Sequence, residues 1–476
     1  MVNFFSLIFF GISGIIAGVV QGFFQCALSY FKAFSYSFDR NYSLKTKAKF
    51  GEPSQEKYFF NKQYEDLLNT YESAKSINTG NILRLKGELE VRSHFTYYRV
   101  KAAQKVIYIV GALLNAVFFS IHFLIITVIS LPVYMLYFMV MSVEKIKFVR
   151  GRIWGVCPHC LSKFNIPYYV CPNCGRVHKV LTPGPYGIIK RKCKCKKVIP
   201  CTNLGGRFKL KALCPVCGKD IESRESSPIC IPVVGPKSSG KTSFVYSAIS
   251  TLIEHISGEK KWNMRFLNQE SEEKIHRCVA LFKKGIPPEK TANNHTDVYN
   301  VFINSHKFAS EKLLYLYDIA GEYFNLRSNI RIQNHYKYIQ GLVFIIDPLC
   351  MAHKEKYVKK ENFIKINSVN ANVHDFIDRF ILGLREINQI ELKKLIPVPL
   401  AVIVNKMDLF NYDGDIEDFL RDIGEDTIIK KFEYNFANYK FFPCSLVEDG
   451  DYKWGLKEAV SWILNESNNE LKVGSS

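Results

Sequence analysis

Two stretches of this 476-residue chain lack charge altogether. Residues 1–31 and residues 106–143 contain no Asp, Glu, Lys or Arg. Each stretch is longer than the roughly 20 apolar residues that a helix needs to cross a bilayer. A secretory signal peptide would need a basic start and a small-residue cleavage site, and residues 1–31 show neither. The sequence therefore predicts membrane helices in both stretches.

Acidic residues are scarce in the middle of the chain. Residues 144–224 hold 18 Lys and Arg but only 3 Asp and Glu, a net charge of +15 against +20 for the whole chain. Residues 225–476 sum to −1, so the C-terminal half is not basic. A basic block directly after a membrane helix favours attraction to anionic lipid headgroups. Contact with nucleic acid is the less favoured alternative.

The second uncharged stretch allows two arrangements. A single helix over 106–143 would be about 57 Å long at 1.5 Å per residue, which is more than a bilayer requires. Either two helices turn near Asn115 to His122, or one long helix bends at Pro132. Basic residues on both flanks favour the hairpin, with both flanks in the cytoplasm. We predict a transmembrane helix over 1–31 with its N-terminus outside, a helical cytoplasmic connection over 32–105 and a transmembrane hairpin over 106–143, with two or three crossings left open.

Cysteine is rare outside one region, because nine of the 14 cysteines lie between 157 and 217. They form closely spaced pairs, which are typical of four-thiolate zinc sites. Disulfides are the alternative, and a reducing cytoplasm disfavours them. We predict a zinc ribbon over 150–182 with ligands Cys157, Cys160, Cys171 and Cys174, and a second over 186–225 with ligands Cys193, Cys195, Cys214 and Cys217. Cys201 is left as a spare ligand or core residue, and His159 and His178 are predicted to be surface residues.

A glycine-rich loop follows the apolar run 228–234. From Gly235 to Ser243 it has the pattern GxxxxGK[ST], in which backbone N–H groups cradle phosphates at the start of a helix. Lys241 is expected to reach the β and γ oxygens, and the Thr242 hydroxyl to bind Mg²⁺. The predicted nucleotide contacts in this loop are Gly235, Lys237, Ser238, Ser239, Gly240, Lys241, Thr242 and Ser243.

A second motif ends the apolar run 313–317. Asp318-Ile-Ala-Gly321 has the pattern DxxG. The Asp318 carboxylate can support Mg²⁺, and the Gly321 amide can sense the γ-phosphate. The run 341–346, which ends at Asp347, predicts a further buried parallel strand.

A third motif, Asn405-Lys406-Met407-Asp408, has the pattern NKxD after the apolar run 400–404. The Asp408 carboxylate can accept two hydrogen bonds from guanine, and the Lys406 stem can lie along the base. A fourth segment, Ser445 and Leu446, follows another apolar strand and is expected near guanine O6. Asn405, Lys406, Asp408, Ser445 and Leu446 are therefore predicted nucleotide contacts.

Taken together, these four motifs resemble the P-loop GTPases of the Ras-like, translation-factor-related (TRAFAC) class. The resemblance covers 226–468 and implies an α/β domain with a doubly wound, mostly parallel sheet that binds GTP or GDP with Mg²⁺. The order of membrane helices, two zinc ribbons and this domain is similar to bacterial double-GTPase families. That similarity implies a separate GTPase subunit as a partner.

Two features depart from small GTPases. A long insertion follows the P-loop helix, so the switch threonine is either Thr296 or Thr291, and Thr296 is favoured because it directly precedes the apolar run 298–303. Glu322 follows DxxG where Ras-like enzymes carry a water-orienting Gln, which implies slow hydrolysis or activation of water by the carboxylate. The resemblance implies Lys241, Glu322 and Thr296 as catalytic residues, and Thr242, Thr296 and Asp318 as Mg²⁺ ligands.

The sequence thus predicts a membrane-anchored GTP-hydrolysing switch that acts on a protein partner. Its zinc ribbons and GTPase domain are expected in the cytoplasm, with GTP or GDP, Mg²⁺ and two Zn²⁺ as bound groups. One alternative is a nucleic-acid sensor that uses the basic ribbons. Another is a scaffold that binds GTP without turnover.

Overall fold

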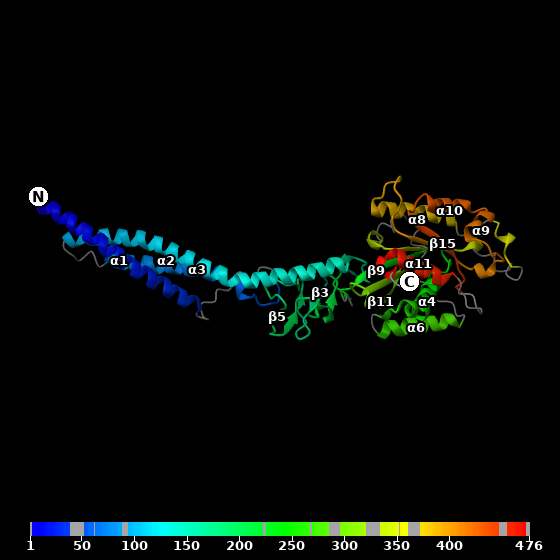
Figure 1. Cartoon of the computed structure of the whole chain (residues 1–476), viewed down its shortest axis with the longest axis horizontal. Coiled ribbons are helices and arrows are strands. Elements are labelled where there is room, and N and C mark those ends of the chain that lie inside the picture. Colours follow the sequence, from blue (N-terminus) through cyan, green and yellow to red (C-terminus); the bar gives the residue numbers. More distant parts are fainter. Residues whose placement is uncertain are drawn as a thin grey trace. The chain divides into compact units, whose positions relative to one another are not determined.

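The computed structural model of the chain forms two compact units (Figure 1). The N-terminal unit comprises Met1–Lys145 and Tyr169–Leu210, and the C-terminal unit comprises Ile146–Tyr168 and Lys211–Ser476. The structure describes residues 2–38, 52–60, 62–87, 94–221, 225–266, 269–284, 296–319, 334–351, 353–359, 372–446 and 455–472.

Three helices dominate the N-terminal unit: α1 (Val2–Phe38), α2 (Lys62–Gly87) and α3 (His94–Arg150). Two of them are long and apolar enough to cross a membrane by length and composition, α1 over Phe4–Tyr36 and α3 over Arg99–Arg150. In contrast, α2 is polar and carries both acidic and basic residues.

The predicted hairpin over 106–143 is wrong, because α3 is one helix that runs through Pro132 without a turn. The polar residues that suggested a turn instead pack against α1. Cys26 donates a hydrogen bond to Asn115 Oδ1 at 3.3 Å, and Tyr30 Oη lies 3.1 Å from His122 Nδ1. Asn115 and His122 therefore join α3 to α1. Because their polar side chains are bonded in this way, the helix continues between these two residues.

Small residues allow α1 to approach α3 closely. A Cβ on Gly14 would lie 2.4 Å from the Arg99 carbonyl oxygen, and one on Gly18 would lie 2.9 Å from that of Ala103. The glycines thus form a contact face of the small-xxx-small kind. This spacing was visible in the sequence, but the helix that it contacts was not.

The rest of the N-terminal unit is built from short strands: β3 (Tyr168–Val170), β4 (Val177–His178), β5 (Lys190–Lys192) and β6 (Val198–Pro200). β3 pairs with β4 and β5 with β6, both antiparallel. Two fully buried arginines hold this region together. Arg207 donates to Glu144 of α3 at 2.6 Å, and Arg191 lies 3.5 Å from the buried Glu52. Part of the positive charge of residues 144–224 is therefore internal and neutralised.

A seven-stranded sheet forms the core of the C-terminal unit, in the order β10-β11-β12-β9-β13-β14-β15. β12, β9, β13, β14 and β15 pair in parallel, while β10 and β11 add two antiparallel pairings at one edge. The strands are β9 (Ser227–Val234), β10 (Asn263–Phe266), β11 (Thr296–Asn304), β12 (Lys312–Ile319), β13 (Leu342–Ile346), β14 (Leu400–Val404) and β15 (Tyr439–Pro443). Every residue of β9, β12, β13 and β14 is buried, as expected for strands covered on both faces.

Helices cover both faces of this sheet, so the mostly parallel α/β fold agrees with the prediction (Figure 1). One face, with Phe344 and Ile346, packs against α8 (Val373–Asn388), α9 (Ile416–Asp422) and α10 (Asp426–Glu433). The other face, with Val343 and Ile345, packs against α4 (Lys241–Thr251), α6 (Gln269–Lys283) and α11 (Leu456–Ser467).

Replacing Phe344 by Ala is predicted to destabilise the C-terminal unit by about 3–5 kcal/mol, the usual cost of deleting a buried aromatic ring. The ring is fully buried and lies 5.3 Å from the Phe432 ring and 5.8 Å from the Phe376 ring, between centroids. Chemical denaturation followed by tryptophan fluorescence measures this, because all four tryptophans belong to the C-terminal unit. Leu392→Ala, at a side chain 78% exposed, is the control and should change the free energy of unfolding by less than about 0.5 kcal/mol.

Candidate functional site

The glycine-rich loop lies between β9 and α4, at the carboxyl edge of the sheet. Gly240 has φ of +96°, a conformation that only glycine adopts readily, and a Cβ there would lie 2.4 Å from Asn405 Nδ2. A Cβ on Gly235 would lie 2.5 Å from the Ile345 carbonyl oxygen. Both glycines are required because neighbouring strand ends crowd the loop, which brings its backbone within reach of a ligand.

Lys241 begins α4 and folds back over the loop. Its Nζ donates hydrogen bonds to the carbonyl oxygens of Gly235 at 3.0 Å and Pro236 at 2.7 Å, and the side chain is buried. The ammonium group is thus held over the cradle formed by the loop. Ser239 is fully buried in the same loop, and its hydroxyl makes no hydrogen bond within the described residues.

Two of the three predicted Mg²⁺ ligands meet. The Thr242 hydroxyl donates to Asp318 Oδ2 at 2.7 Å, and Asp318 is fully buried near the end of β12. A hydroxyl beside a carboxylate is a donor set that suits Mg²⁺. β11 begins at Thr296, whose backbone pairs with Ile319, one residue beyond Asp318. Thr291, Gly321 and Glu322 lie outside the described residues.

Asn405 joins the third motif to the phosphate loop. Its Nδ2 donates to the Ser239 carbonyl oxygen at 2.9 Å, and its Oδ1 accepts from the Lys406 N–H at 2.8 Å. Its own N–H donates to the Ile346 carbonyl oxygen at 2.9 Å. One side chain therefore fixes the end of β14 against the loop that follows β9.

Sequence reasoning missed a role for Asp347. This carboxylate is buried directly after β13, and its Oδ2 lies 2.5 Å from Lys406 Nζ. Its Oδ1 accepts from the Leu349 N–H at 3.0 Å. The pair fixes the direction of the Lys406 side chain. An acidic residue at the end of an entirely apolar strand was the signal that could have identified it.

The last predicted contacts lie at the same edge. Met407 N–H donates to the Cys444 carbonyl oxygen at 3.1 Å, which joins the NKxD turn to the end of β15. Ser445 is fully buried, and its hydroxyl has no hydrogen-bond partner within the described residues. Asp408 is half-buried in a short 3₁₀ turn, Met407–Leu409. The structure thus brings four separate motifs together at one sheet edge.

The eight predicted zinc ligands form two groups of four, but their partners differ from the prediction. The C-terminal unit contains one group, here called the outer tetrad, made of Cys157, Cys160, Cys214 and Cys217. The N-terminal unit contains the other, the inner tetrad, made of Cys171, Cys174, Cys193 and Cys195. The ribbons predicted over 150–182 and 186–225 are therefore wrong as contiguous units. The spacing of the cysteines identifies each closely spaced pair, here called a knuckle. The packing of the hairpins decides which two knuckles form one tetrad.

Both tetrads have the size of a tetrahedral zinc site. Within each, the sulfurs lie within 4.8 Å of one another, and the closest pairs are 3.6 and 3.7 Å apart. A Zn–S bond of about 2.3 Å in a tetrahedron gives sulfur separations of about 3.8 Å. The residues present therefore fit zinc. The outer tetrad is held by two hairpins, β1 (Gly155–Val156) with β2 (Lys163–Phe164) and β7 (Ala212–Leu213) with β8 (Asp220–Ile221).

Tight turns present the sulfurs. Gly175 has φ of +68° and its N–H donates to the Cys171 carbonyl oxygen at 3.0 Å, and Gly218 repeats this arrangement with Cys214. A hydrogen bond from the Asn173 side chain lowers the pKa of the Cys195 thiol, which favours its thiolate form. Thiolate is the form that binds zinc.

Three residues near the tetrads were left open or predicted to lie at the surface. Cys201 belongs to neither tetrad and accepts a hydrogen bond from Arg191 Nε at 3.3 Å, so it is a buried core residue. His159 contacts the Asp220 carbonyl oxygen at 3.2 Å. His178 is fully buried, 3.5 Å from Glu52, so its predicted surface position is wrong.

The outer tetrad packs against the nucleotide-binding sheet. Tyr338 donates a hydrogen bond to the carbonyl oxygen of Leu161, the residue after Cys160, and its ring lies 5.4 Å from that of Trp154. Tyr338 ends a short 3₁₀ turn, Asn334–Tyr338, on the chain between DxxG and β13. This contact joins the Cys157–Cys160 knuckle to the 3₁₀ turn that lies between the DxxG motif and β13.

Pairs of substitutions distinguish the two ways of pairing the knuckles. Cys157→Ser combined with Cys214→Ser is predicted to leave one bound zinc per chain, because both sulfurs belong to the outer tetrad. Cys157→Ser combined with Cys171→Ser is predicted to remove both, because each tetrad loses a ligand. Elemental analysis of purified protein measures the zinc content. If the first variant instead loses both zinc ions and the second keeps one, cysteine pairs that are neighbours in the sequence share a zinc site, and the pairing described here is wrong.

The comparison with protein families agrees with this site. Residues 229–463 match the model of the Double-GTPase 2 family. No curated protein matches the sequence. Among solved structures, the Roco2 RocCORdC protein of Methanosarcina barkeri, bound to GDP, is matched with 12% identity and a TM-score of 0.26, over 50% of this chain and 49% of that chain. The family match and the geometry at the sheet edge support a GTPase family for this domain and a GTP-binding protein.

Proposed function

We propose that the protein binds GTP with Mg²⁺ at the carboxyl edge of the sheet, hydrolyses it, and acts as a switch on a protein partner. The observation that carries this proposal is the hydrogen bond from Asn405 to the Ser239 carbonyl oxygen. It joins a phosphate-binding loop to a base-reading motif in one rigid site. A loop that cradled phosphates alone would not need this link.

The phosphate end is formed by the loop that precedes α4. Its backbone N–H groups and the positive end of the helix attract the phosphates, and the buried Lys241 ammonium adds a full charge. Thr242, Asp318 and Thr296 would hold Mg²⁺, which neutralises charge on the phosphates when bound. The hydrogen bond between Thr242 and Asp318 already places two of these groups side by side.

The base end is formed by three strand ends. Asp408 would accept hydrogen bonds from two guanine N–H groups, which adenine does not offer in this arrangement. The Lys406 stem would lie along the base, with its ammonium held by Asp347. Ser445 and Leu446 would lie near guanine O6, where a buried hydroxyl and the neighbouring backbone are available.

Hydrolysis would use Glu322 to position or activate the attacking water. The family match supports GTP hydrolysis as an activity, and the slow rate is our proposal from glutamate in place of glutamine. Ordering of Thr296 and of the segment after Asp318 by the γ-phosphate would signal the bound state. The bond from Tyr338 to Leu161 gives that signal a route to the outer tetrad, where a partner, including a separate GTPase subunit, would detect it.

The two zinc ions would be structural, since each tetrad stabilises short hairpins that bury little apolar surface. Exposed lysines on the inner-tetrad hairpin favour anionic lipid headgroups as the surface contacted. Nucleic-acid contact stays the weaker proposal, because Arg191 and Arg207 are buried in ion pairs and cannot reach phosphates.

Lys241→Ala is predicted to weaken GTP binding at least about 100-fold, because it removes a buried cation that faces the phosphates; charged hydrogen bonds contribute about 1.5–3 kcal/mol each. Calorimetry or fluorescent-nucleotide titration of the full chain with Mg²⁺ measures this. Lys393→Ala, at an exposed lysine of the same domain outside the four motifs, is the control and should change affinity by less than about two-fold.

Asp408→Asn is predicted to reduce the preference for GTP over ATP by about 10-fold or more, because the bidentate carboxylate contact is lost. Competition between GTP and ATP for the wild-type and variant proteins measures the ratio. Equal competition by ATP in the wild-type protein would contradict guanine recognition.

Single-turnover assays separate a switch from a scaffold. With Mg²⁺ and excess protein, the wild type is predicted to release phosphate from GTP, and Glu322→Ala to slow the release about 100-fold, as expected for loss of a group that acts on the attacking water. Binding without release above the Lys241→Ala background would favour the scaffold instead. Nucleotide affinity is measured alongside, so that weaker binding is not mistaken for slower hydrolysis.

A further inference from the structure

The direction of the three long helices constrains how the N-terminal unit meets a membrane. Later residues of α1 contact later residues of α3. Gly14 lies against Arg99, Gly18 against Ala103 and Tyr30 against His122. The two apolar helices are therefore parallel. If both crossed a bilayer, the chain between them would have to cross back.

The helix that returns is α2, and it is polar. Its contacts run in the opposite sense, from Tyr64 with Phe123 through Tyr71 with Phe119. Glu65, Glu72, Lys75 and Arg84 are exposed on its outward face. Charged side chains at the centre of a bilayer each cost about 2.5–3.5 kcal/mol or more, so α2 is a poor membrane-spanning helix.

Other parts of the N-terminal unit pack along most of α3. α2 lies beside it as far as Phe123. Phe60, from the segment before α2, packs on Tyr134 and Tyr137. Beyond that, Glu144 pairs with the buried Arg207. From Phe123 to Tyr134 the helix advances only about 17 Å at 1.5 Å per residue, against about 30 Å of hydrocarbon.

The outward faces of α1 and α3 are nevertheless strongly apolar. On α1, Phe9 is 69% and Phe24 62% exposed. On α3, exposed apolar side chains run from Tyr108, at 62%, to Val149, at 78%. That stretch is about 62 Å long, twice what a crossing helix needs. Such a length fits a helix that lies along a surface better than one that crosses it.

Basic side chains lie at both ends of the apolar part of α3. Lys101 and Lys105 are exposed before it, and Lys147 and Arg150 follow it. A crossing helix would place one of these groups on the far side, against the preference of basic residues for the cytoplasmic side. A helix lying in one leaflet places all four at the same layer of anionic headgroups.

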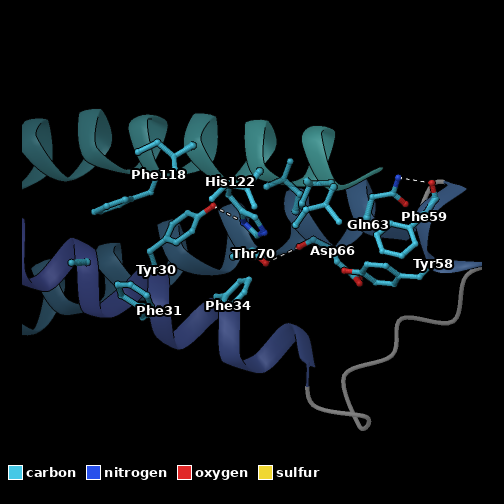
Figure 2. A pocket seen from close by; sticks show the side chains of 16 residues that line it. Tyr30, Phe31, Phe34, Tyr58, Phe59, Gln63, Asp66, Thr70, Phe118 and His122 are labelled. Atoms are coloured by element: carbon cyan, nitrogen blue, oxygen red, sulfur yellow. Dashed lines mark hydrogen bonds between the residues drawn. The ribbon is translucent and has the colours of Figure 1, made fainter. Parts of the chain in front are cut away.

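An apolar cavity of about 420 Å³ lies within this bundle. Figure 2 shows Tyr30, Phe31 and Phe34 of α1 on one side and Phe118 and His122 of α3 on the other. Its lining is almost wholly apolar, and the few polar groups bond to one another, as Tyr30 does to His122. The cavity adds apolar surface suited to lipid chains.

We propose that α1 and α3 insert their apolar faces into a single leaflet, on the side where the GTPase domain lies, while α2 faces water. The helices then anchor the protein without crossing the bilayer. Both helix N-termini, the basic flanks and the C-terminal unit share one side. The occupant of the apolar faces is the acyl-chain layer of that leaflet.

Sidedness tests this arrangement. A protease site is placed at the N-terminus, within residues 88–93, or after Ser476, and the full chain is reconstituted in sealed vesicles containing anionic lipid. Cleavage at each of the other two sites without detergent is divided by cleavage at the site after Ser476. This ratio corrects for molecules that insert with either orientation in the vesicles. One-leaflet insertion predicts a ratio of about 1 for the other two sites, since all lie on one side. A ratio near zero that rises only with detergent would overturn the proposal.

A matched pair of tryptophans tests depth independently of cleavage. Val117→Trp lies on the exposed face of α3, and Thr79→Trp on the exposed face of α2. Bromine in the lipid acyl chains is predicted to quench the emission that Val117→Trp adds, by about half or more, and that of Thr79→Trp by less than about a tenth, because interfacial helices bury only one face. Equal quenching of both would place α2 within the bilayer and overturn the proposal.

Discussion

The parallel pairing of β9 between β12 and β13 is the constraint on which the C-terminal unit depends. Chains leave a parallel sheet at its carboxyl edge, so the loops after these strands must share one edge. The neighbouring strand β13 crowds the phosphate loop at this edge. The Ile345 carbonyl oxygen lies so close to Gly235 that no side chain fits there. Asn405 then ties β14 to the same loop. The site is rigid because backbone geometry, rather than any one side chain, brings its parts together.

The arrangement of four cysteine sulfurs in a tetrahedron is a second constraint, and each unit contains one such tetrad. Each tetrad needs four thiolates at tetrahedral separations, and short hairpins supply them in pairs. The inner tetrad closes within the N-terminal unit, whereas the outer tetrad joins residues 157–160 to 214–217 within the C-terminal unit. The outer tetrad is also joined through Leu161 to Tyr338, in the 3₁₀ turn that precedes β13.

Electrostatics decides how the N-terminal unit uses its apolar surface. The +15 of residues 144–224 is partly internal, because Arg191 and Arg207 are buried against Glu52 and Glu144. The Arg207–Glu144 pair fastens the cysteine-rich region to α3 just beyond residues 106–143, and the Arg191–Glu52 contact fastens it to the segment before α2. The polar helix α2 accompanies α3 as far as Phe123. The apolar side chains that stay exposed on α1 and α3, with basic residues at both ends of α3, are the surface for which insertion into one leaflet is proposed.

The sequence by itself determined the nucleotide site to a large extent, since each motif carries its chemistry in consecutive residues. Thr242 and Asp318 meet as expected. The sequence also identified the eight cysteines of the two tetrads and two long apolar stretches. Only the tertiary structure decided which cysteine pairs meet, that α3 is unbroken, that His178 is buried and that Asp347 holds Lys406. The physical reason is range: motifs act over a few residues, whereas partners distant in sequence are chosen by packing, which spacing alone does not encode.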